Sequence, residues 1–353
     1  MAPDFTAART LLQRAIAERA FPSAVVEAGT PTQPIWQEAF GRLSYDHDAP
    51  SASLDTIYDL ASLTKVLATT PLAMRAVEGG AVALDEAVSA HIPQWTGGDR
   101  LSVTVRDLLA HCSGLPAHRE YFRDHRGREA FQRAIAAEPL DYEPRTQSIY
   151  SDLGFMLLGF IIGGREGLAT HFDALKSHTG SAQDLQFHPP DIWRRRTAPT
   201  QVDAWRGRLL IGEVDDNNAS ALDGEAGHAG LFGTAMAVGD QARHLLQVLE
   251  GRTGAYRRDT ARTFISRRTE IPGSSRALGW DTMLPTSSCG TRMSARAIGH
   301  TGFTGTSLWI DPERGLYVVL LTNRVYGGGS TDAIAQVRRE LHDAVIDALP
   351  WAL

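Results

Sequence analysis

The order of the expected elements predicts an α+β fold, with an antiparallel sheet built from both chain ends and flanked by helices. Strand-like runs occur near both ends, whereas helical patterns fill the middle. With 353 residues, the chain is too long for one simple core. We therefore expect residues 1–80 and 225–353 to form one α/β lobe and residues 81–224 to form an inserted, all-helical lobe. The functional site should lie between the two lobes, where ligands often bind.

The first lobe begins with an amphipathic helix, which is followed by strand-like runs at 24–30, 34–41 and 56–60. From Leu63 the apolar positions follow a helical period until two glycines stop it. Pro71 lies inside that pattern and should bend the helix, because proline has no N–H to donate.

The middle and the end of the chain differ in their patterns. Helical candidates in the middle lie at 83–91, 104–111, 128–137 and 153–163. After a helix that should end near Leu249, strand-like stretches follow near 277–283, 295–301, 305–311 and 316–324. The turn at 311–315 makes the last two stretches a hairpin, and a helix over 332–348 closes the chain.

Composition and charge argue against several classes of function. The net charge of −6 argues against nucleic acid as the main partner, and the basic run 194–196 is interpreted as a solvated surface. The most apolar stretch, 154–164, is about half the length needed to cross a bilayer, so it predicts a buried helix and no membrane partner. Cys112 and Cys289 match no metal or redox spacing. Because no secretory signal is recognised, we expect a cytoplasmic protein with reduced thiols, although a chain trimmed of its signal would look the same.

The segment 59–70, DLASLTKVLATT, breaks a local rule. A helix should begin at Ser62, where the partial positive charge of the helix N-terminus favours an acidic side chain, yet Lys65 occupies the first turn. The chain has 33 Arg but only two Lys, Lys65 and Lys176, so Arg supplies a plain positive charge almost everywhere. Lys differs from Arg because a desolvated ammonium can lose its proton. Lys65 therefore indicates proton-transfer chemistry.

Ser62 and Lys65 are three residues apart, so they share one face of a helix. A serine hydroxyl is a poor nucleophile until a neighbouring base removes its proton, and a desolvated Lys can be that base or hold another base in place. The pair therefore predicts nucleophilic catalysis. The alternative is that Ser62 is only a helix cap, but Lys65 argues against a first turn optimised for capping.

Two later segments extend this pattern: Tyr150-Ser151-Asp152 comes directly before an apolar helix, and His300-Thr301-Gly302 lies in a Gly-rich stretch. In this order the segments resemble the S-x-x-K, Y-x-N and K-T-G motifs of the serine β-lactamase and penicillin-binding-protein superfamily. The similarity looks closest to the class C-like branch, which also includes esterases and D-amino-acid peptidases. Residues 108–116 and 227–235 are similar too, so the resemblance covers roughly residues 20–345.

The resemblance implies a fold of the β-lactamase/transpeptidase type and a role for each motif residue. Ser62 would be the acylated nucleophile, Lys65 its proton partner and Tyr150 the group nearest the leaving atom. Whether Lys65 or Tyr150 takes the first proton is left open. A phenol titrates near pH 10, so a neighbouring ammonium would have to lower the pKa of Tyr150 before it could act as a base. No cofactor and no metal are implied.

The remaining motif residues would bind substrate. The backbone N–H groups of Ser62 and Phe303 would form an oxyanion hole. Thr301 and Gly302 lie on the same expected strand, and a glycine there would let a ligand approach the backbone closely.

The sequence departs from the family pattern at two positions. Asp152 stands where the family usually has Asn, and its carboxylate is expected to pair with Lys65 and hold it charged. That pairing favours Tyr150 as the base and weakens the case for efficient β-lactam turnover. His300 stands where the family has Lys; since His is charged only below roughly pH 6.5, recognition of a substrate carboxylate should be weaker or pH-dependent.

Structural interpretations compete at several positions. Asp152 would usually be the cap of the following helix, and it could be cap and ligand at once. A hydrogen-bonding role within the fold is favoured for His111, whereas structural and functional roles are evenly balanced for His228. The aromatic side chains expected to pack rather than contact substrate are Trp280, Trp309 and Phe303.

The sequence thus predicts a serine hydrolase that acts through an acyl-enzyme on a small ester or amide. The alternatives are a β-lactamase or D-Ala-D-Ala carboxypeptidase, and, in another class, a ligand-binding homologue without turnover. A metallohydrolase ranks last because H-E-x-x-H and similar ligand spacings are absent, and the polar run 214–219 lacks the EF-hand pattern. The natural substrate and the oligomeric state are not predicted.

Overall fold

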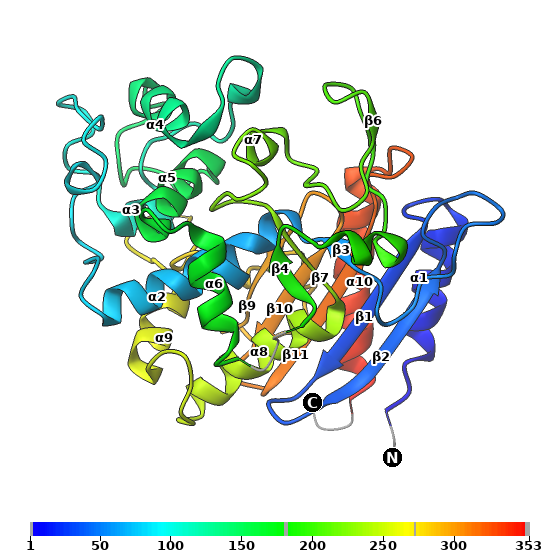
Figure 1. The fold of residues 1–353 in the computed structure, drawn as a ribbon. Helices are drawn as coiled ribbons and strands as arrows, with labels where there is room; N and C mark the ends of the chain where they lie inside the picture. Colours follow the sequence, from blue (N-terminus) through cyan, green and yellow to red (C-terminus); the bar gives the residue numbers. More distant parts are fainter. Residues whose placement is uncertain (1–2, 180–182, 272, 350–353) are drawn as a thin grey trace.

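The computed structural model describes residues 3–179, 183–271 and 273–349, and its centre is a six-stranded antiparallel sheet (Figure 1). Its strand order is β2-β1-β11-β10-β9-β8. The strands are β1 (Ser23–Gly29), β2 (Pro34–Gly41), β8 (Asp281–Thr282), β9 (Ile298–Thr301), β10 (Ser307–Asp311) and β11 (Leu316–Thr322). The first and last strands of the chain meet at β1 and β11, where Val25 lies opposite Leu321. The expected sheet from both chain ends is therefore confirmed.

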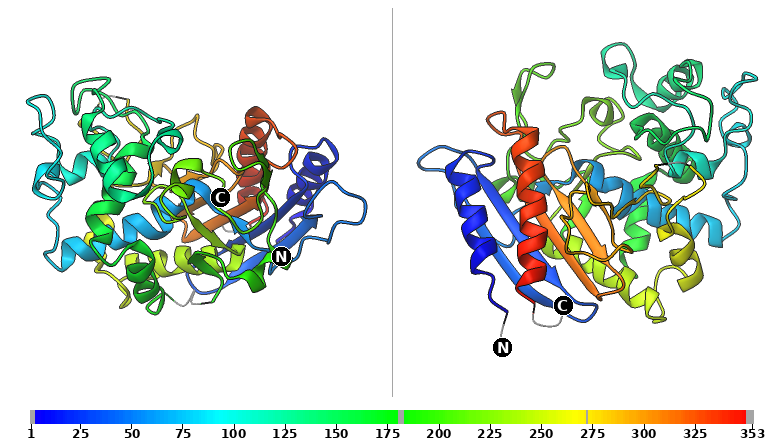
Figure 2. Two further views of the ribbon diagram at one scale, coloured as in Figure 1. Left: turned by 45° about the horizontal axis from the view of Figure 1, so that its top comes forward. Right: turned by 180° about the vertical axis from the view of Figure 1, so that it is seen from behind.

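Two helices cover one face of the sheet and a third covers the other. α1 (Thr6–Ala17) and α10 (Thr331–Asp347) lie side by side across one face (Figure 2), and α8 (Ala235–Leu249) packs on the opposite face. β11 is buried along its whole length because it lies between these layers. This burial explains why its sequence, LYVVLLT, is a continuous apolar run.

The middle of the chain supplies helices and a few short strands. The helices are α3 (Val105–Leu109), α4 (Gly127–Ala137), α5 (Asp152–Gly163), α6 (Leu168–Lys176) and α7 (Asn217–Ser220), with α9 (Arg258–Ile265) following α8. The short strands are β3 (Tyr58–Asp59), β4 (Leu185–Phe187), β5 (Val202–Asp203), β6 (Arg208–Leu209) and β7 (Leu231–Gly233). Residues 81–224 therefore include β4, β5 and β6 besides helices, and none of these strands joins the large sheet. The division into two lobes stays a prediction.

The helix predicted at 83–91 is wrong, since only a 3₁₀ turn, Val88–Ala90, forms there. The backbone of this segment bonds to a neighbouring segment instead of to itself. The Val88 amide donates to the Val103 carbonyl, and the Glu86 carbonyl accepts from the Val105 amide. The amphipathic pattern was real, but tertiary pairing uses the groups that a helix would need.

From Ala61 to Glu78 the chain forms three consecutive helical segments of different pitch rather than one bent helix. Ala61–Leu63 is a 3₁₀ turn, Lys65–Thr69 is π-helical, and α2 (Thr70–Glu78) is an α-helix. Pro71 stands in the first turn of α2 and cannot donate to the carbonyl four residues earlier, so the preceding turn widens. The Thr70 amide reaches back to the Lys65 carbonyl, five residues away.

Among the described residues, no single helix is long and apolar enough to cross a membrane. α5 and α6 pass that test only together, and they are bent by 73° relative to each other.

We expect Gly227→Ala to destabilise the fold by about 1–3 kcal/mol, because a Cβ there would meet the backbone of Phe155 and Gly159 in α5. The carbonyl of Gly227 also accepts from Thr69 Oγ1 at 2.7 Å, in the π-helical turn that holds Lys65, so the substitution should disturb that turn as well. Urea unfolding measures the first effect. Gly98→Ala is the matched control, since Gly98 is exposed and a Cβ added there would meet no atom within 4 Å. Equal stability of the two variants would contradict this packing argument.

Candidate active site

A cleft of about 590 Å³ brings the predicted motif residues together. Ser62 reaches it from the 3₁₀ turn, Tyr150 from the residue two before α5, and Asp152 from the first turn of α5. The opposite wall is formed by the end of β9 and the turn that follows it, residues 300–303. Lys65 lies behind Ser62 and is fully buried.

Ser62, Lys65 and Tyr150 form a closed triangle of hydrogen bonds. Ser62 Oγ is 2.9 Å from Lys65 Nζ and 2.7 Å from Tyr150 Oη, and these two groups are 2.5 Å apart. No side chain caps the 3₁₀ turn that contains Ser62, so the capping alternative is wrong. The hydroxyl is placed for chemistry by two groups that can exchange protons with it.

The ammonium of Lys65 has more acceptors than protons. Besides Ser62 and Tyr150, Lys65 Nζ lies 2.8 Å from Asp152 Oδ1 and 3.2 Å from the carbonyl oxygen of His228. An ammonium has three protons, so these four acceptors cannot all be served at once. The hydroxyl of Tyr150 donates to Ser62 Oγ at 2.7 Å, so Ser62 keeps a donor when Lys65 serves the other three acceptors.

Asp152 sets the charge state of this cluster, as its predicted pairing with Lys65 implied. Burial alone would lower the pKa of Lys65, but the carboxylate of Asp152 and the Tyr150 oxygen outweigh it, so the pKa of Lys65 is raised. Burial acts against the charge of Asp152 too, yet Lys65 and His118 bring its pKa well below the usual range. At neutral pH the pair is an ammonium and a carboxylate.

Tyr150 does not have the lowered pKa that it would need to act as a base at neutral pH; its pKa is raised. Burial and the carboxylate of Asp152 raise the pKa of Tyr150 more than the ammonium lowers it. In the free protein Tyr150 is therefore a neutral phenol. Losing its proton becomes easier only when negative charge near it is removed or when the pH rises.

Asp152 is held by a second partner that the sequence did not indicate. His118 Nδ1 is 3.6 Å from Asp152 Oδ2, and this contact raises the pKa of His118. The expectation that Asp152 caps the helix is wrong, because Ser151 does so: its hydroxyl accepts from the Gly154 amide. Each carboxylate oxygen of Asp152 thus has a basic side chain as its neighbour, Lys65 for Oδ1 and His118 for Oδ2.

His300 does not supply the charge that the family's Lys would supply. Its Nδ1 is 2.8 Å from the Thr301 carbonyl, which can only accept, so the proton of the neutral ring is on Nδ1. Burial, with Lys65 and Arg276 nearby, lowers the pKa of His300 to about 3. The prediction that His300 carries a pH-dependent positive charge near neutral pH is therefore wrong.

Arg276 is a cation at the cleft that the sequence did not indicate. It lines the cleft, and its guanidinium carbon lies 5.5 Å from the centre of the Tyr150 ring. Its nearest carboxylate, that of Asp281, is 4.0 Å away. Nothing in a chain with 33 arginines marks this one, since its position depends on the turn between α9 and β8.

Ser62 and Phe303, whose backbone amides are predicted to form the oxyanion hole, both line the cleft. Among the described residues, neither the Ser62 amide nor the Phe303 amide donates a hydrogen bond to the protein. Ala61, just before Ser62, has a left-handed backbone with φ of +46°, which a residue with a side chain rarely adopts. The Asp59 carboxylate stabilises this strained turn by accepting from the Ala61 amide at 2.8 Å. Burial and the nearby Asp215 raise the pKa of Asp59 to about 7.

The turn after β9 is bonded directly to the turn that carries Ser62. Thr304 Oγ1 donates to the Asp59 carbonyl at 2.8 Å, and Thr306 Oγ1 donates to the Leu60 carbonyl at 3.1 Å. Gly302 lies between these segments, where a Cβ would meet Thr306 and the Leu60 carbonyl. The protein itself therefore excludes a Cβ at Gly302, and because Gly302 also lines the cleft, the close approach of a ligand to its backbone stays a prediction.

Arg338 on α10 holds the peptide group that presents the Phe303 amide. Its guanidinium is buried and donates to the carbonyl oxygens of Gly302 and Thr306, both at 2.8 Å. The Gly302 carbonyl and the Phe303 N–H belong to one peptide unit. A cation on the carbonyl end orients that unit and polarises its N–H toward the cleft.

Of the predictions for the remaining histidines and aromatic residues, some are confirmed and some are wrong. His111 has the expected hydrogen-bonding role: its Nδ1 accepts from the Ser151 amide, and its ring lies against that of Tyr150. His228 bonds Asp216 through Nε2, at 2.9 Å, and contacts Lys65 only through its backbone. Trp280 and Trp309 are buried as expected, although Trp309 also lines the cleft. Phe303 is not a packing group, since it is 61% exposed at the cleft.

Comparison with known proteins agrees with this geometry. Residues 8–343 match the Beta-lactamase family model. The chain belongs to the Beta-lactamase family. Over 76% of its length it is 33% identical to an "N-acetylmuramyl-L-alanine amidase" of Bacillus subtilis, of which it covers 68%. Over 77% of its length it is 31% identical to a "Putative D-alanyl-D-alanine carboxypeptidase" of Salmonella gallinarum, of which it covers 70%.

A solved structure supports the same fold for this Beta-lactamase family chain. The structure of "EstCE1, a hydrolase with promiscuous acyltransferase activity" superposes with a TM-score of 0.73 at 22% identity, covering 95% of this chain and 97% of that one. The family and the fold together make this chain a serine hydrolase with the β-lactamase fold.

Asp152→Asn should move the rise of kcat/KM with pH to lower pH by about one to three units. The carboxylate raises the pKa of both Lys65 and Tyr150, so removing it lets either group lose its proton at a lower pH. The measurement is the pH profile of ester hydrolysis. Asp216→Asn is the control, because Asp216 bonds His228 and not Lys65. An unchanged profile for Asp152→Asn would show that neither group acts as the base.

Arg338→Met should lower kcat by about tenfold to a hundredfold with little change in KM, because an oxyanion is bound only in the transition state. Arg338→Lys should retain part of the rate, since it keeps the charge. Steady-state kinetics measure the effect, and urea unfolding checks the fold. The control is Arg339→Met, which removes a neighbouring arginine that bonds the carbonyls of Pro285 and Ser287. Equal losses in both variants would assign Arg338 to general stability alone.

Proposed function

We propose that the chain hydrolyses small esters or amides through an acyl-enzyme on Ser62. The observation that carries this proposal is the position of Ser62 Oγ, at a cleft wall and within hydrogen-bond distance of both Lys65 Nζ and Tyr150 Oη. A hydroxyl with two proton-exchanging neighbours is the arrangement that nucleophilic catalysis needs.

Acylation would begin from the form in which Tyr150 has lost its proton to solvent, because the neutral phenol cannot accept another proton. The phenolate, which the adjacent ammonium of Lys65 stabilises, takes the proton of Ser62 as Oγ attacks the carbonyl carbon. Tyr150 is the better candidate for the base, because Asp152 holds Lys65 charged. The developing oxyanion would accept from the amides of Ser62 and Phe303. Tyr150 next gives the proton to the leaving group, and a water repeats these steps to release the acid and regenerate Ser62.

Arg276 supports a further preference for substrates that carry a carboxylate near the scissile bond. It is a cation at the cleft that is not tightly paired, whereas His300 is neutral. A guanidinium binds a carboxylate through two parallel hydrogen bonds. The relatives named as an amidase and as a carboxypeptidase support the peptide version of this class.

Turnover of β-lactams is the second candidate within this class. The family's Asn would donate to the substrate's amide carbonyl, whereas the carboxylate of Asp152 can only accept, and each of its oxygens already has a basic neighbour. We therefore propose weak β-lactam turnover.

Ligand binding without hydrolysis is the alternative from another class of function. The cytoplasmic location also stays a prediction, and Cys112 and Cys289 are free and buried.

A fluorophosphonate probe should label Ser62, and mass spectrometry of the digested protein should place the adduct on that residue. Ser62→Ala should abolish both labelling and hydrolysis of p-nitrophenyl acetate. Nitrocefin should be hydrolysed much more slowly than the ester by the unmodified chain. Full esterase activity in Ser62→Ala would refute the nucleophile, whereas stoichiometric labelling without turnover of any substrate would favour the ligand-binding alternative.

A further inference from the structure

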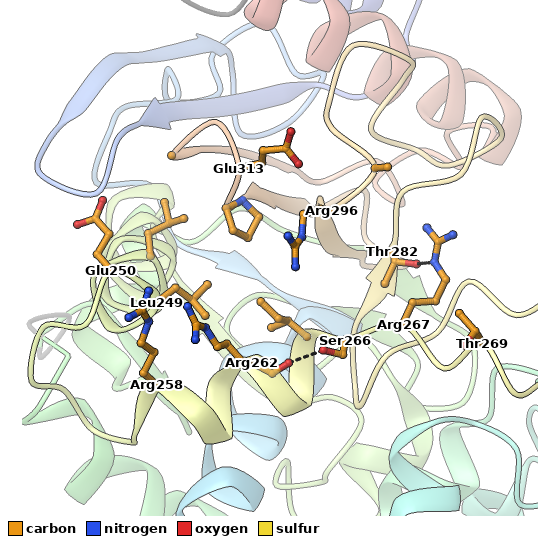
Figure 3. Close-up of a pocket in the computed structure, with 15 residues that line it drawn as sticks. Leu249, Glu250, Arg258, Arg262, Ser266, Arg267, Thr269, Thr282, Arg296 and Glu313 are labelled. Carbon is orange, nitrogen blue, oxygen red and sulfur yellow. Dashed lines mark hydrogen bonds between the residues drawn. The ribbon is translucent and has the colours of Figure 1, made fainter.

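A second cavity lies outside the catalytic cleft. It has a volume of about 950 Å³ and lies between the end of α8, α9, the residues before β9 and the turn joining β10 to β11 (Figure 3). It shares no lining residue with the cleft. The strand β8 separates the two spaces: Asp281 lines the cleft and its neighbour Thr282 lines the cavity, since consecutive strand residues point to opposite faces.

Three arginines converge on this cavity without carboxylate partners. Arg258 and Arg262 come from α9, and their guanidinium groups lie next to each other, whereas Arg296 points into the same space from the opposite wall (Figure 3). Within the described parts of the chain, none of the three forms an ion pair with an Asp or Glu. A fourth arginine, Arg267, is committed to Thr282 and the Met283 carbonyl.

Two like charges share one face of α9. Arg258 is the first residue of α9, where the helix dipole disfavours positive charge. Arg262 follows at i+4, so the two charges repel, although Arg262 lies in the last turn, where the dipole favours a cation, and Asp259 is acidic in the first turn. Of the acidic side chains that line the cavity, Glu250 pairs with Arg252, and neither Glu250 nor Glu313 forms an ion pair with the three arginines in the described parts of the chain.

The floor of the cavity is apolar. Leu246 and Leu249 of α8 and Ile265 of α9 line it, with Pro312 from the β10–β11 turn. A purely inorganic ion would leave this surface in contact with water. An apolar floor next to clustered guanidinium groups therefore fits a ligand that has both an anionic head and an apolar body.

We propose that this cavity binds an organic phosphate monoester. Its dianionic phosphate group bonds Arg258, Arg262 and Arg296, and its apolar part covers Leu249 and Ile265. Three guanidinium groups around one space favour a tetrahedral dianion with several acceptor oxygens over a single carboxylate, which one arginine can satisfy. The site is separate from Ser62, so the proposal does not depend on the acyl-enzyme.

The test is calorimetric titration of the full chain with phenyl phosphate at pH 8. We expect one site per chain and weaker binding of inorganic phosphate, which lacks the apolar part. Arg262→Gln and Arg296→Gln should each weaken the binding of phenyl phosphate by about tenfold or more. Arg262→Lys should retain part of the affinity, because it keeps the charge.

Three controls make the result decisive. Arg195→Gln, an exposed arginine in the basic run 194–196, should leave binding unchanged. The cavity variants should keep the melting temperature and the p-nitrophenyl acetate turnover of the unmodified chain. Arg276→Gln should not affect binding, since Arg276 lies in the catalytic cleft.

The proposal is overturned by any of four results: no binding of phenyl phosphate, equal affinity for inorganic phosphate, full affinity in both glutamine variants of the cavity, or loss of binding in Arg276→Gln.

Discussion

The structure of the active site depends on the buried ammonium of Lys65. This group contacts Ser62 on the preceding 3₁₀ turn, Tyr150 and Asp152 at the start of α5, and the His228 carbonyl in the loop before β7. A charge that is removed from water without partners costs several kcal/mol or more, so these contacts must form together when the chain folds. Three segments that are distant in sequence are therefore fixed around one nitrogen atom.

The opposite wall of the cleft is fixed by backbone groups rather than by a charge pair. The threonines of the turn after β9 bond the carbonyls of Asp59 and Leu60, so this turn and the turn that carries Ser62 cannot shift independently. Arg338 then holds the Gly302 carbonyl from α10. The two amides expected to bind an oxyanion come from opposite ends of the chain, and the sheet assembled from both ends is what brings those ends together.

The catalytic motif could be predicted from the sequence because each member breaks a local expectation or lies next to a strong pattern. Lys65 has the wrong sign for a helix start, and Tyr150 precedes the most apolar helix. Asp59, His118, Arg276 and Arg338 could not be found in this way. Each acts through a tertiary contact, with no spacing rule that links it to Ser62, and the arginines are hidden among many others.

The fold shows the same contrast. The strands β1, β2 and β11 were predicted almost to the residue, because a buried strand is an apolar run that is visible locally. The helix expected at 83–91 does not form, because its backbone groups pair with residues 103–105.

The two departures from the family pattern change the electrostatics of the cleft in the same direction. Asp152 replaces a neutral amide with a negative charge, and His300 replaces a positive charge with a neutral ring, so both changes make the cleft more negative than the family pattern would. Both changes disfavour a phenolate at Tyr150, which agrees with its raised pKa. Arg276 restores only part of the lost charge, because Asp281 lies close to it. A site of this kind holds its nucleophile less activated at neutral pH, and the preference for a carboxylate proposed above depends on Arg276, since His300 is neutral.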